Sequence, residues 1–365
     1  MINLHFFPSR RIAFYTVKLF LTRSLAVLVA LVLILMTLDL LGESGKILRV
    51  ESNGDAELWR YVSLRLPLLT ARFLPFSVLL GTLIAFAGLN QHSEVVAMKA
   101  AGISAHQILA PLIVASLGIA AIAFAFNETV VVNSARALTA WTDNDYRPVP
   151  RKKDLLSNVW LLDGEDLVRA RQVTGQGAAL RATGVSIFDR DKGTLRQIIE
   201  AERAVPRGDS WLLQNVRIYN SASNVSRSAQ AMVALQGIAP ERFTLAKVDP
   251  DQLDFFTLKQ RMEQLEQAGS SAGEARAGLW HKISSPLSTL LMPLLAAVAA
   301  FGLARSGQVL VRATVGMALG FAYFVADNFS LAMGNVGAYP PIIAAWAPFF
   351  LFLLIGETVL VRSEE

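Results

Sequence analysis

The sequence contains no cysteine and few histidines. Without cysteine the chain can form no disulfide, no thiolate metal site and no cysteine nucleophile. The histidines show no His-Glu-x-x-His spacing, and no Gly-x-Ser-x-Gly elbow is present. Zinc and serine hydrolases are therefore excluded, and we expect no catalytic residue, no metal and no enzymatic activity. The four histidines are His5, His92, His106 and His281.

A phosphate-binding loop is also missing. The nearest approach, Gly42-Glu-Ser-Gly-Lys46, has the wrong spacing, lacks Ser or Thr after the lysine and follows an apolar run instead of a strand. We therefore expect no cofactor on this chain, and any ATP would be bound by a partner. The net charge of +5 is small and its basic residues are mixed with acidic ones, so nucleic acid is not an expected partner.

Charged residues are scarce, at 17% of the chain against 53% hydrophobic residues, and the mean hydropathy is +0.43. This composition is typical of an integral membrane protein. Residues 1–18 read as an interfacial segment, and the prolines Pro67 and Pro75 predict a kink in the second span. Six apolar runs can each cross a hydrocarbon core of about 30 Å: 19–41, 62–89, 108–126, 283–303, 309–333 and 341–361.

The composition changes between residues 127 and 278, where charged residues return. Short alternating runs separated by turn signals predict an inserted all-β domain, with a sandwich or an open jelly roll as its form. A helix is expected to start at a capping box beginning with Thr257 and to lead back to the membrane. The predicted domains are residues 1–127, 128–278 and 279–365. The predicted strands are 158–162, 166–172, 181–189, 194–201, 211–219 and 231–235.

The distribution of Lys and Arg sets the expected orientation. Basic residues near span ends predict the cytoplasmic side, which places both termini there and the β domain outside the membrane on the other side. The loop at 42–60 runs against this bias, but acidic residues accompany its basic ones. The residues used are Arg10, Arg11, Lys18, Arg23, Lys99, Arg305, Arg312 and Arg362.

A short polar-edged stretch, residues 88–104, lies between the second and third spans. Ser93 can cap a helix, Glu94 falls in its first turn and Gly102 can end it in a left-handed cap. This helix is too short to span a bilayer, and its apolar residues include Met98. It could dock a soluble ATPase, or it could be a structural interfacial helix; the residues alone leave both open.

Ionisable residues within the spans are candidates for ligand contact, because a charge in lipid costs at least about 2.5 kcal/mol. Arg65 and Arg72 are seven residues apart and are expected on one helical face, where they could meet an anionic head group or pair with an acid such as Asp39. For Asp327 and Glu357 an internal salt bridge or a hydrogen bond facing the helix bundle is favoured over a proton relay. Apolar strand faces of the β domain could hold acyl chains or simply form its core.

Several motifs along the chain resemble one family. They are Ser93-Glu-Val-Val-Ala-Met98 with Gly102-Ile-Ser104, Leu74-Pro75 with Leu80-Gly81, Val248-Asp-Pro-Asp251, Trp280-His-Lys-Ile283 with Pro286-Leu287, and Tyr339-Pro-Pro341. Together they resemble the LptF/LptG permease family, the membrane subunits of the lipopolysaccharide export ABC transporter, and its LptG branch more than its LptF branch. The resemblance covers nearly the whole chain and includes the layout of six spans around an external domain.

This resemblance implies a subunit of the bacterial inner membrane that extracts lipopolysaccharide and passes it to a periplasmic bridge. The implied partners are an LptF-like permease subunit, an LptB-like ATPase dimer and an LptC-like periplasmic protein. ATPase coupling would fall on Glu94, Met98, Ser93 and Gly102, and substrate binding on Arg65, Arg72, Lys46 and Asp39.

One position departs from the family. The basic residue that some members carry three positions before the aspartate of span one is Met36 here.

Two alternatives to lipopolysaccharide export are kept. One is a permease for another lipid or for lipoprotein, and the other is a non-transporting membrane receptor with a β sensor domain.

Overall fold

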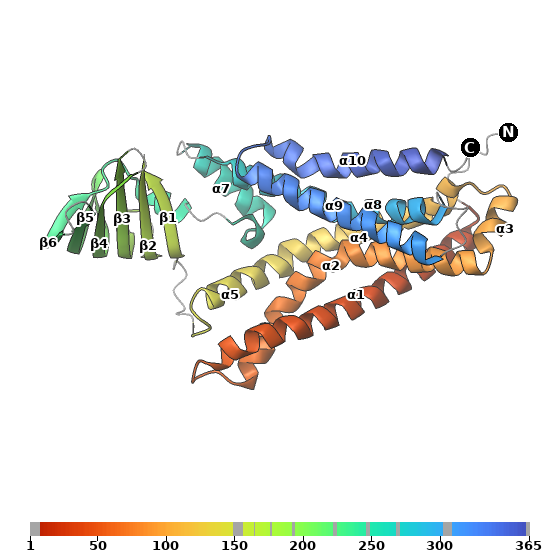
Figure 1. Cartoon of the computed structure of the whole chain (residues 1–365), viewed down its shortest axis with the longest axis horizontal. Helices are drawn as coiled ribbons and strands as arrows, with labels where there is room; N and C mark the ends of the chain where they lie inside the picture. The colour runs from red at the N-terminus through yellow and green to blue at the C-terminus, as the bar shows by residue number, and fades with distance from the viewer. Residues whose placement is uncertain are drawn as a thin grey trace. The chain divides into compact units, whose positions relative to one another are not determined.

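A computed structural model describes residues 8–148, 156–163, 165–175, 177–191, 194–221, 225–245, 249–267, 271–301 and 309–362 (Figure 1). The chain divides into two compact units. Unit 1 comprises Met1–Thr139, Pro250–Met262 and Ser271–Glu365, and unit 2 comprises Ala140–Asp249 and Glu263–Ser270. Unit 1 holds the long apolar helices and unit 2 holds the sheet.

Long helices form unit 1. Six helical segments among the described residues are long and apolar enough to cross a membrane, which confirms the predicted number of spans. Figure 1 shows α2 changing direction along its length, as its two interior prolines lead one to expect. The helices of these segments are α1 (Arg10–Leu48), α2 (Asp55–Gln91), α4 (Ala105–Phe126), α8 (Gly273–Phe301), α9 (Val309–Asn335) and α10 (Pro341–Arg362).

The first two helices extend well beyond their apolar runs. α1 continues through Gly42 to Leu48 and α2 begins at Asp55, so the predicted loop over 42–60 is wrong except for the short turn between them. The Glu57 carboxylate accepts a hydrogen bond from the Gly54 N–H over 2.9 Å at the start of α2. A carboxylate on a free N–H favours a helix start at this point, outside the apolar run.

The helix of the third span also continues beyond its apolar run. After α4 the chain makes a π-helical turn, η1 (Asn127–Val131), and then continues as α5 (Val132–Thr142). Composition changes at residue 127, but the helix does not end there. π-helical turns inside α-helices often occur at functional or strained positions, and this one carries Glu128, described below.

The core of unit 1 lies between α2, α4 and α8. Phe86, Ile108 and Leu295 are among its fully buried side chains. α1 approaches α2 closely at Gly81, where an added Cβ would overlap the backbone of Ser24. A small residue at such a crossing lets two membrane helices pack backbone to backbone, which explains the Leu80-Gly81 pair in structural terms.

The described residues of unit 2 form six strands in one antiparallel sheet, and the order of the strands in the sheet follows the sequence. The all-β class and the first five predicted strands are confirmed, whereas the last strand begins at Val225, six residues before the predicted 231–235. A sandwich or jelly roll divides its strands between two sheets; the described strands instead form a meander, because each turn joins neighbours. The strands are β1 (Leu156–Asp163), β2 (Asp166–Thr174), β3 (Arg181–Asp191), β4 (Thr194–Arg207), β5 (Ser210–Asn220) and β6 (Val225–Ala234).

The apolar alternation of this sheet changes phase midway along its strands. Residues three apart on a regular strand point to opposite faces, yet such pairs share one buried cluster here. Gly184 in β3 and Asn215 in β5 lie inside two of these pairs and have φ of +62° and +53°. Their left-handed backbone lets both halves of a strand face one core. The pairs are Ala170 and Val173, Ala182 and Val185, Ala201 and Ala204, and Leu213 and Val216.

The chain returns to unit 1 through the 3₁₀ turn η3 (Pro250–Gln252) and helix α7 (Phe255–Gln267). The predicted capping box beginning at Thr257 is wrong. Asp254 caps the helix instead: its carboxylate accepts from the Thr257 N–H over 3.0 Å, and its carbonyl accepts from the Leu258 N–H over 2.8 Å. Aspartate is among the preferred residues at this position, so α7 begins two residues before Thr257.

Candidate functional site

The short helix between the second and third spans is α3 (Glu94–Ala100). At its end the Gly102 N–H bonds the Lys99 carbonyl over 3.0 Å and the Ile103 N–H bonds the Met98 carbonyl over 3.1 Å, with Gly102 at φ +81°. This pattern is the Schellman motif, and it confirms the predicted left-handed cap at Gly102.

The start of α3 differs from the prediction. Ser93 stands at the N-cap position, but its φ is +56° and its side chain makes no capping hydrogen bond. A side-chain cap needs an extended backbone at this residue, and the tight turn from α2 leaves it left-handed instead. Ser93 therefore supplies only its carbonyl, which accepts from the Ala97 N–H over 2.9 Å.

The two faces of α3 have different surroundings. Val95 is buried, and Met98 and Ile103 pack against the same helical core. Val96 and Lys99 are exposed, with 65% of the Val96 surface accessible. Met98, expected to contact a partner, thus faces the chain's own core, and the exposed face available for docking is formed by Val96 and Lys99.

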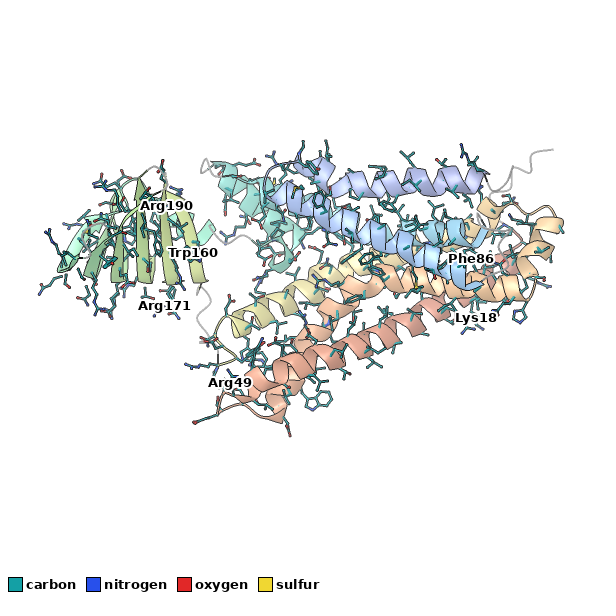
Figure 2. The ribbon with its side chains drawn as sticks, in the orientation of Figure 1. Lys18, Arg49, Phe86, Trp160, Arg171 and Arg190 are labelled. Atoms are coloured by element: carbon teal, nitrogen blue, oxygen red, sulfur yellow. The ribbon has the colours of Figure 1, made fainter. Side chains whose placement is uncertain are left out.

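Glu94 is half-buried at the start of α3, and its carboxylate Oε1 accepts a hydrogen bond from the Tyr15 hydroxyl of α1 over 3.2 Å. This contact places α3 at the end of unit 1 where α1 begins. Figure 2 shows Lys18 and Phe86 toward this end of the helices and Arg49 toward the other. At the same end, His106 near the start of α4 bonds Glu357 of α10 over 3.3 Å.

The predicted substrate residues Asp39 and Arg65 bind each other. Arg65 donates to both carboxylate oxygens of Asp39, each over 2.9 Å, and the Tyr61 hydroxyl donates to the same carboxylate over 2.6 Å. The Arg65 and Asp39 side chains are 28% and 23% exposed. A bidentate pair offsets much of the cost of holding two charges in apolar surroundings, so Arg65 is committed within the chain and Asp39 is the partner of Arg65, not of Arg72.

The other two predicted substrate residues lie apart from this pair. Arg72 is exposed on α2, and no hydrogen bond or ion pair to it occurs within the described part of the chain. Lys46 is in the last turn of α1 and pairs with Glu43 over 2.8 Å; its side chain is 61% exposed. The structure therefore joins two of the four residues and leaves Arg72 as the cation with no partner within the described chain.

A buried ion pair that sequence reasoning missed lies at the opposite end from α3. Glu128, in the π-helical turn, accepts from Lys282 of α8 over 3.0 Å and also from the Phe255 N–H at the start of α7. The Lys282 and Glu128 side chains are only 7% and 14% exposed. The only sequence signal was a charge directly beside each apolar run. The interactions of Glu128 therefore join the turn that follows α4 to α7 and α8, the helices through which the chain returns.

The acidic residues of the last two spans are paired with histidines. Asp327 of α9 bonds His281 of α8 over 3.1 Å, and Glu357 bonds His106. Both carboxylates therefore make a side-chain hydrogen bond within the helical unit, which is one of the two expected uses. Among the described residues, no group of three or more His, Cys, Asp or Glu side chains could hold a metal ion.

An open groove of about 900 Å³ crosses the sheet of unit 2 at the line where its alternation changes phase. Figure 2 shows Arg171 and Arg190 near opposite ends of the strands, and the groove lies at Arg171. Apolar strand faces were one expected site for acyl chains, but the apolar residues form a packed core, and polar and apolar groups contribute equally to the surface of this groove. Its polar lining includes Arg171, Glu200, Glu202, Asn215, Arg217 and Ser228.

Known proteins match this chain along nearly its whole length. The profile of the family described as lipopolysaccharide export system permease LptF/LptG matches residues 14–362. The chain is 26% identical over 313 residues to the lipopolysaccharide export system permease protein LptG of Escherichia coli strain K12, covering 83% of this chain and 85% of that protein. It is 25% identical over 332 residues to the protein of the same name from Haemophilus influenzae, covering 87% of this chain and 90% of that protein. Since the profile runs through both units, the chain belongs to the LptF/LptG family of lipopolysaccharide export system permeases.

Proposed function

We propose that this chain is an LptG-like permease subunit that extracts lipopolysaccharide from the inner membrane and is powered by a separate ATPase. The observation that carries the proposal is the family match over residues 14–362, which includes the six spans, α3 and the sheet. Proteins named lipopolysaccharide export system permease protein LptG align with this chain over most of their own length. The chain itself acts as a transporter subunit without enzymatic activity.

The place of the glycine-rich stretch supports a separate energy source. Gly42-Glu-Ser-Gly-Lys46 lies inside the continuous helix α1, and Lys46 pairs with Glu43. A phosphate loop needs a glycine-rich turn between a strand and a helix, with its lysine directed to the phosphates. Energy would therefore enter through α3, whose exposed face and Glu94 carboxylate are open to an LptB-like ATPase dimer.

The connectivity of the spans supports an orientation. α3 lies between the second and third spans, so it shares a side with the chain ends, and the sheet lies between the third and fourth spans on the other side. Basic residues near α1, α3 and the end of α10 favour the cytoplasm for the first side. α3 and both termini are then cytoplasmic, and the β domain is periplasmic, where it would meet an LptC-like protein.

The substrate contacts are proposed on the side of α2. Arg72 is exposed within a span and has no partner within the described residues, which suits a phosphate or carboxylate of an anionic lipid. Arg65 and Asp39 would hold α1 against α2 beside this contact. An LptF-like subunit would face this side of α2 and enclose the lipid between the two permease halves.

Co-purification followed by transport tests the proposal. The chain, expressed with its natural partners, should bring down a second permease and an ATPase, and mass spectrometry of the sample should show bound lipopolysaccharide. Vesicles containing the complex should release lipopolysaccharide to a periplasmic acceptor only when ATP is added. A complex that binds a different lipid or a lipoprotein, or a chain that purifies with a kinase and no ATPase, would contradict the proposal.

A further inference from the structure

A side-chain hydrogen bond joins the beginning of α1 to α3. The Tyr15 hydroxyl and the Glu94 carboxylate meet at 3.2 Å although the two residues are 79 positions apart in sequence. α1 packs mainly along α2 and α4. The tyrosine therefore links the first span to α3 through the acidic residue expected to face an ATPase.

α3 and α1 are each anchored by contacts other than this hydrogen bond. Val95 is buried in the helical core and the Schellman motif closes the end of the helix, so α3 is held as one unit on its inner side. α1 starts at a cap in which Ser9 accepts from the Ile12 N–H over 3.4 Å, less than two turns before Tyr15. The two ends of the bond are thus carried by separately anchored helices.

Glu94 keeps an acceptor for another group. An ionised carboxylate offers two oxygens and about four acceptor positions, and Tyr15 occupies Oε1. Within the described part of the chain, Oε2 of Glu94 has no hydrogen bond or ion pair. A basic side chain of a docked protein could therefore bind Oε2 while Tyr15 holds Oε1.

We propose that Tyr15 is a positioning residue of the coupling site: it fixes the Glu94 carboxylate for a basic side chain of the ATPase and transmits displacement of α3 to α1. The inference rests on the proposed function, because it needs an ATPase docked at α3. Tyrosine is also common at membrane interfaces as an anchor. An anchoring role alone would not change how much lipid is moved for each ATP.

The test uses Tyr15→Phe in the complete complex in vesicles, with Tyr339→Phe as a matched control, because Tyr339 is similarly exposed, at 41%, and lies in a turn. Loss of this exposed hydrogen bond should lower lipopolysaccharide released per ATP hydrolysed by about three- to tenfold, while the control keeps the wild-type ratio. An unchanged ratio for Tyr15→Phe would overturn the inference. If the wild-type complex itself releases no lipopolysaccharide, the proposed function fails instead.

A distance measurement gives a second readout. The chain has no cysteine, so Phe14→Cys with Val96→Cys places two spin labels on α1 and α3 without the need to remove native cysteines. Both positions are exposed, at 71% and 65%. The distance distribution should be narrow with Tyr15 present and clearly broader with Tyr15→Phe. Identical distributions would contradict the link between the two helices.

Discussion

Two carboxylates of the helical unit stand in opposite settings. Glu128 is 14% exposed and binds both Lys282 and a backbone N–H at the start of α7. Glu94 is half-buried at the start of α3, accepts one hydrogen bond from a neutral hydroxyl and keeps an oxygen without a partner within the described chain. A buried charge with every partner inside the chain serves the fold, whereas an accessible one with a spare acceptor can take a partner from another protein.

The same contrast occurs between the arginines of α2. Arg65 resembles Glu128, because both of its interactions with Asp39 are made inside the chain. Arg72 resembles Glu94, because it is exposed and the described residues provide it with no counter-charge. Substitutions should therefore separate the four residues into two that affect stability and two that affect transport.

Removing Glu128 should have the largest effect on stability. Glu128→Ala leaves Lys282 as a buried unpaired charge and costs about 3–5 kcal/mol, seen as a large fall in the unfolding temperature of the purified protein. The double variant Glu128→Gln with Lys282→Met buries no charge and should recover most of the loss. By comparison, Glu94→Gln should stay within about 0.5 kcal/mol of the wild type. Equal losses for Glu128→Ala and Glu94→Gln would remove the contrast.

A smaller effect is expected on α2. Asp39→Asn takes the charged partner from Arg65 and should cost about 1–3 kcal/mol of stability. Arg72→Gln should leave the unfolding temperature unchanged and reduce lipid binding. Photocrosslinkers placed near position 72 should form adducts with lipopolysaccharide in the wild type, and fewer in Arg72→Gln. If Arg72→Gln destabilises as much as Asp39→Asn, Arg72 has a structural partner after all.

The smallest effect concerns Asp254, which caps α7 beside the N–H bound by Glu128. The hydrogen bond from the Thr257 N–H holds the pKa of Asp254 below the usual range of an aspartate. Its stabilisation is therefore fully present above about pH 4, the unfolded value, and is lost as the pH falls through the lower folded value. Asp254→Ala should cost about 1 kcal/mol at pH 7. In unfolding measurements the difference from the wild type should shrink near pH 3; a constant difference would show that the cap is not ionised.

Local patterns predicted most of the fold. Hydropathy predicted the third span as 108–126, close to α4 (Ala105–Phe126). Alternation predicted a strand over 181–189, close to β3 (Arg181–Asp191). The ends of α1 and α5 were not predictable in this way, because helix outside an apolar run depends on tertiary packing. Trp141, for example, is fully buried at the end of α5 and packs edge-on against Tyr146, with ring centroids 5.2 Å apart.

The candidate site was predictable only where its features are local. The cap at Gly102 follows from glycine near the end of a helical pattern. The Tyr15 contact with Glu94 and the Lys282 contact with Glu128 join residues 79 and 154 positions apart, and such pairings arise only from how helices pack. Ser93 shows the reverse error: its residue type favours a cap, but the turn after α2 sets its backbone in the left-handed region.

The most direct test of the account is charge reversal at α3. In vesicles containing the complete complex, Glu94→Arg should lower lipopolysaccharide release per ATP hydrolysed by about tenfold or more, while the unfolding temperature stays near that of the wild type. Glu51→Arg is the matched control, because Glu51 is exposed in the turn between α1 and α2. We predict a wild-type release ratio for Glu51→Arg and uncoupled hydrolysis for Glu94→Arg. Wild-type transport by a folded Glu94→Arg complex would contradict it.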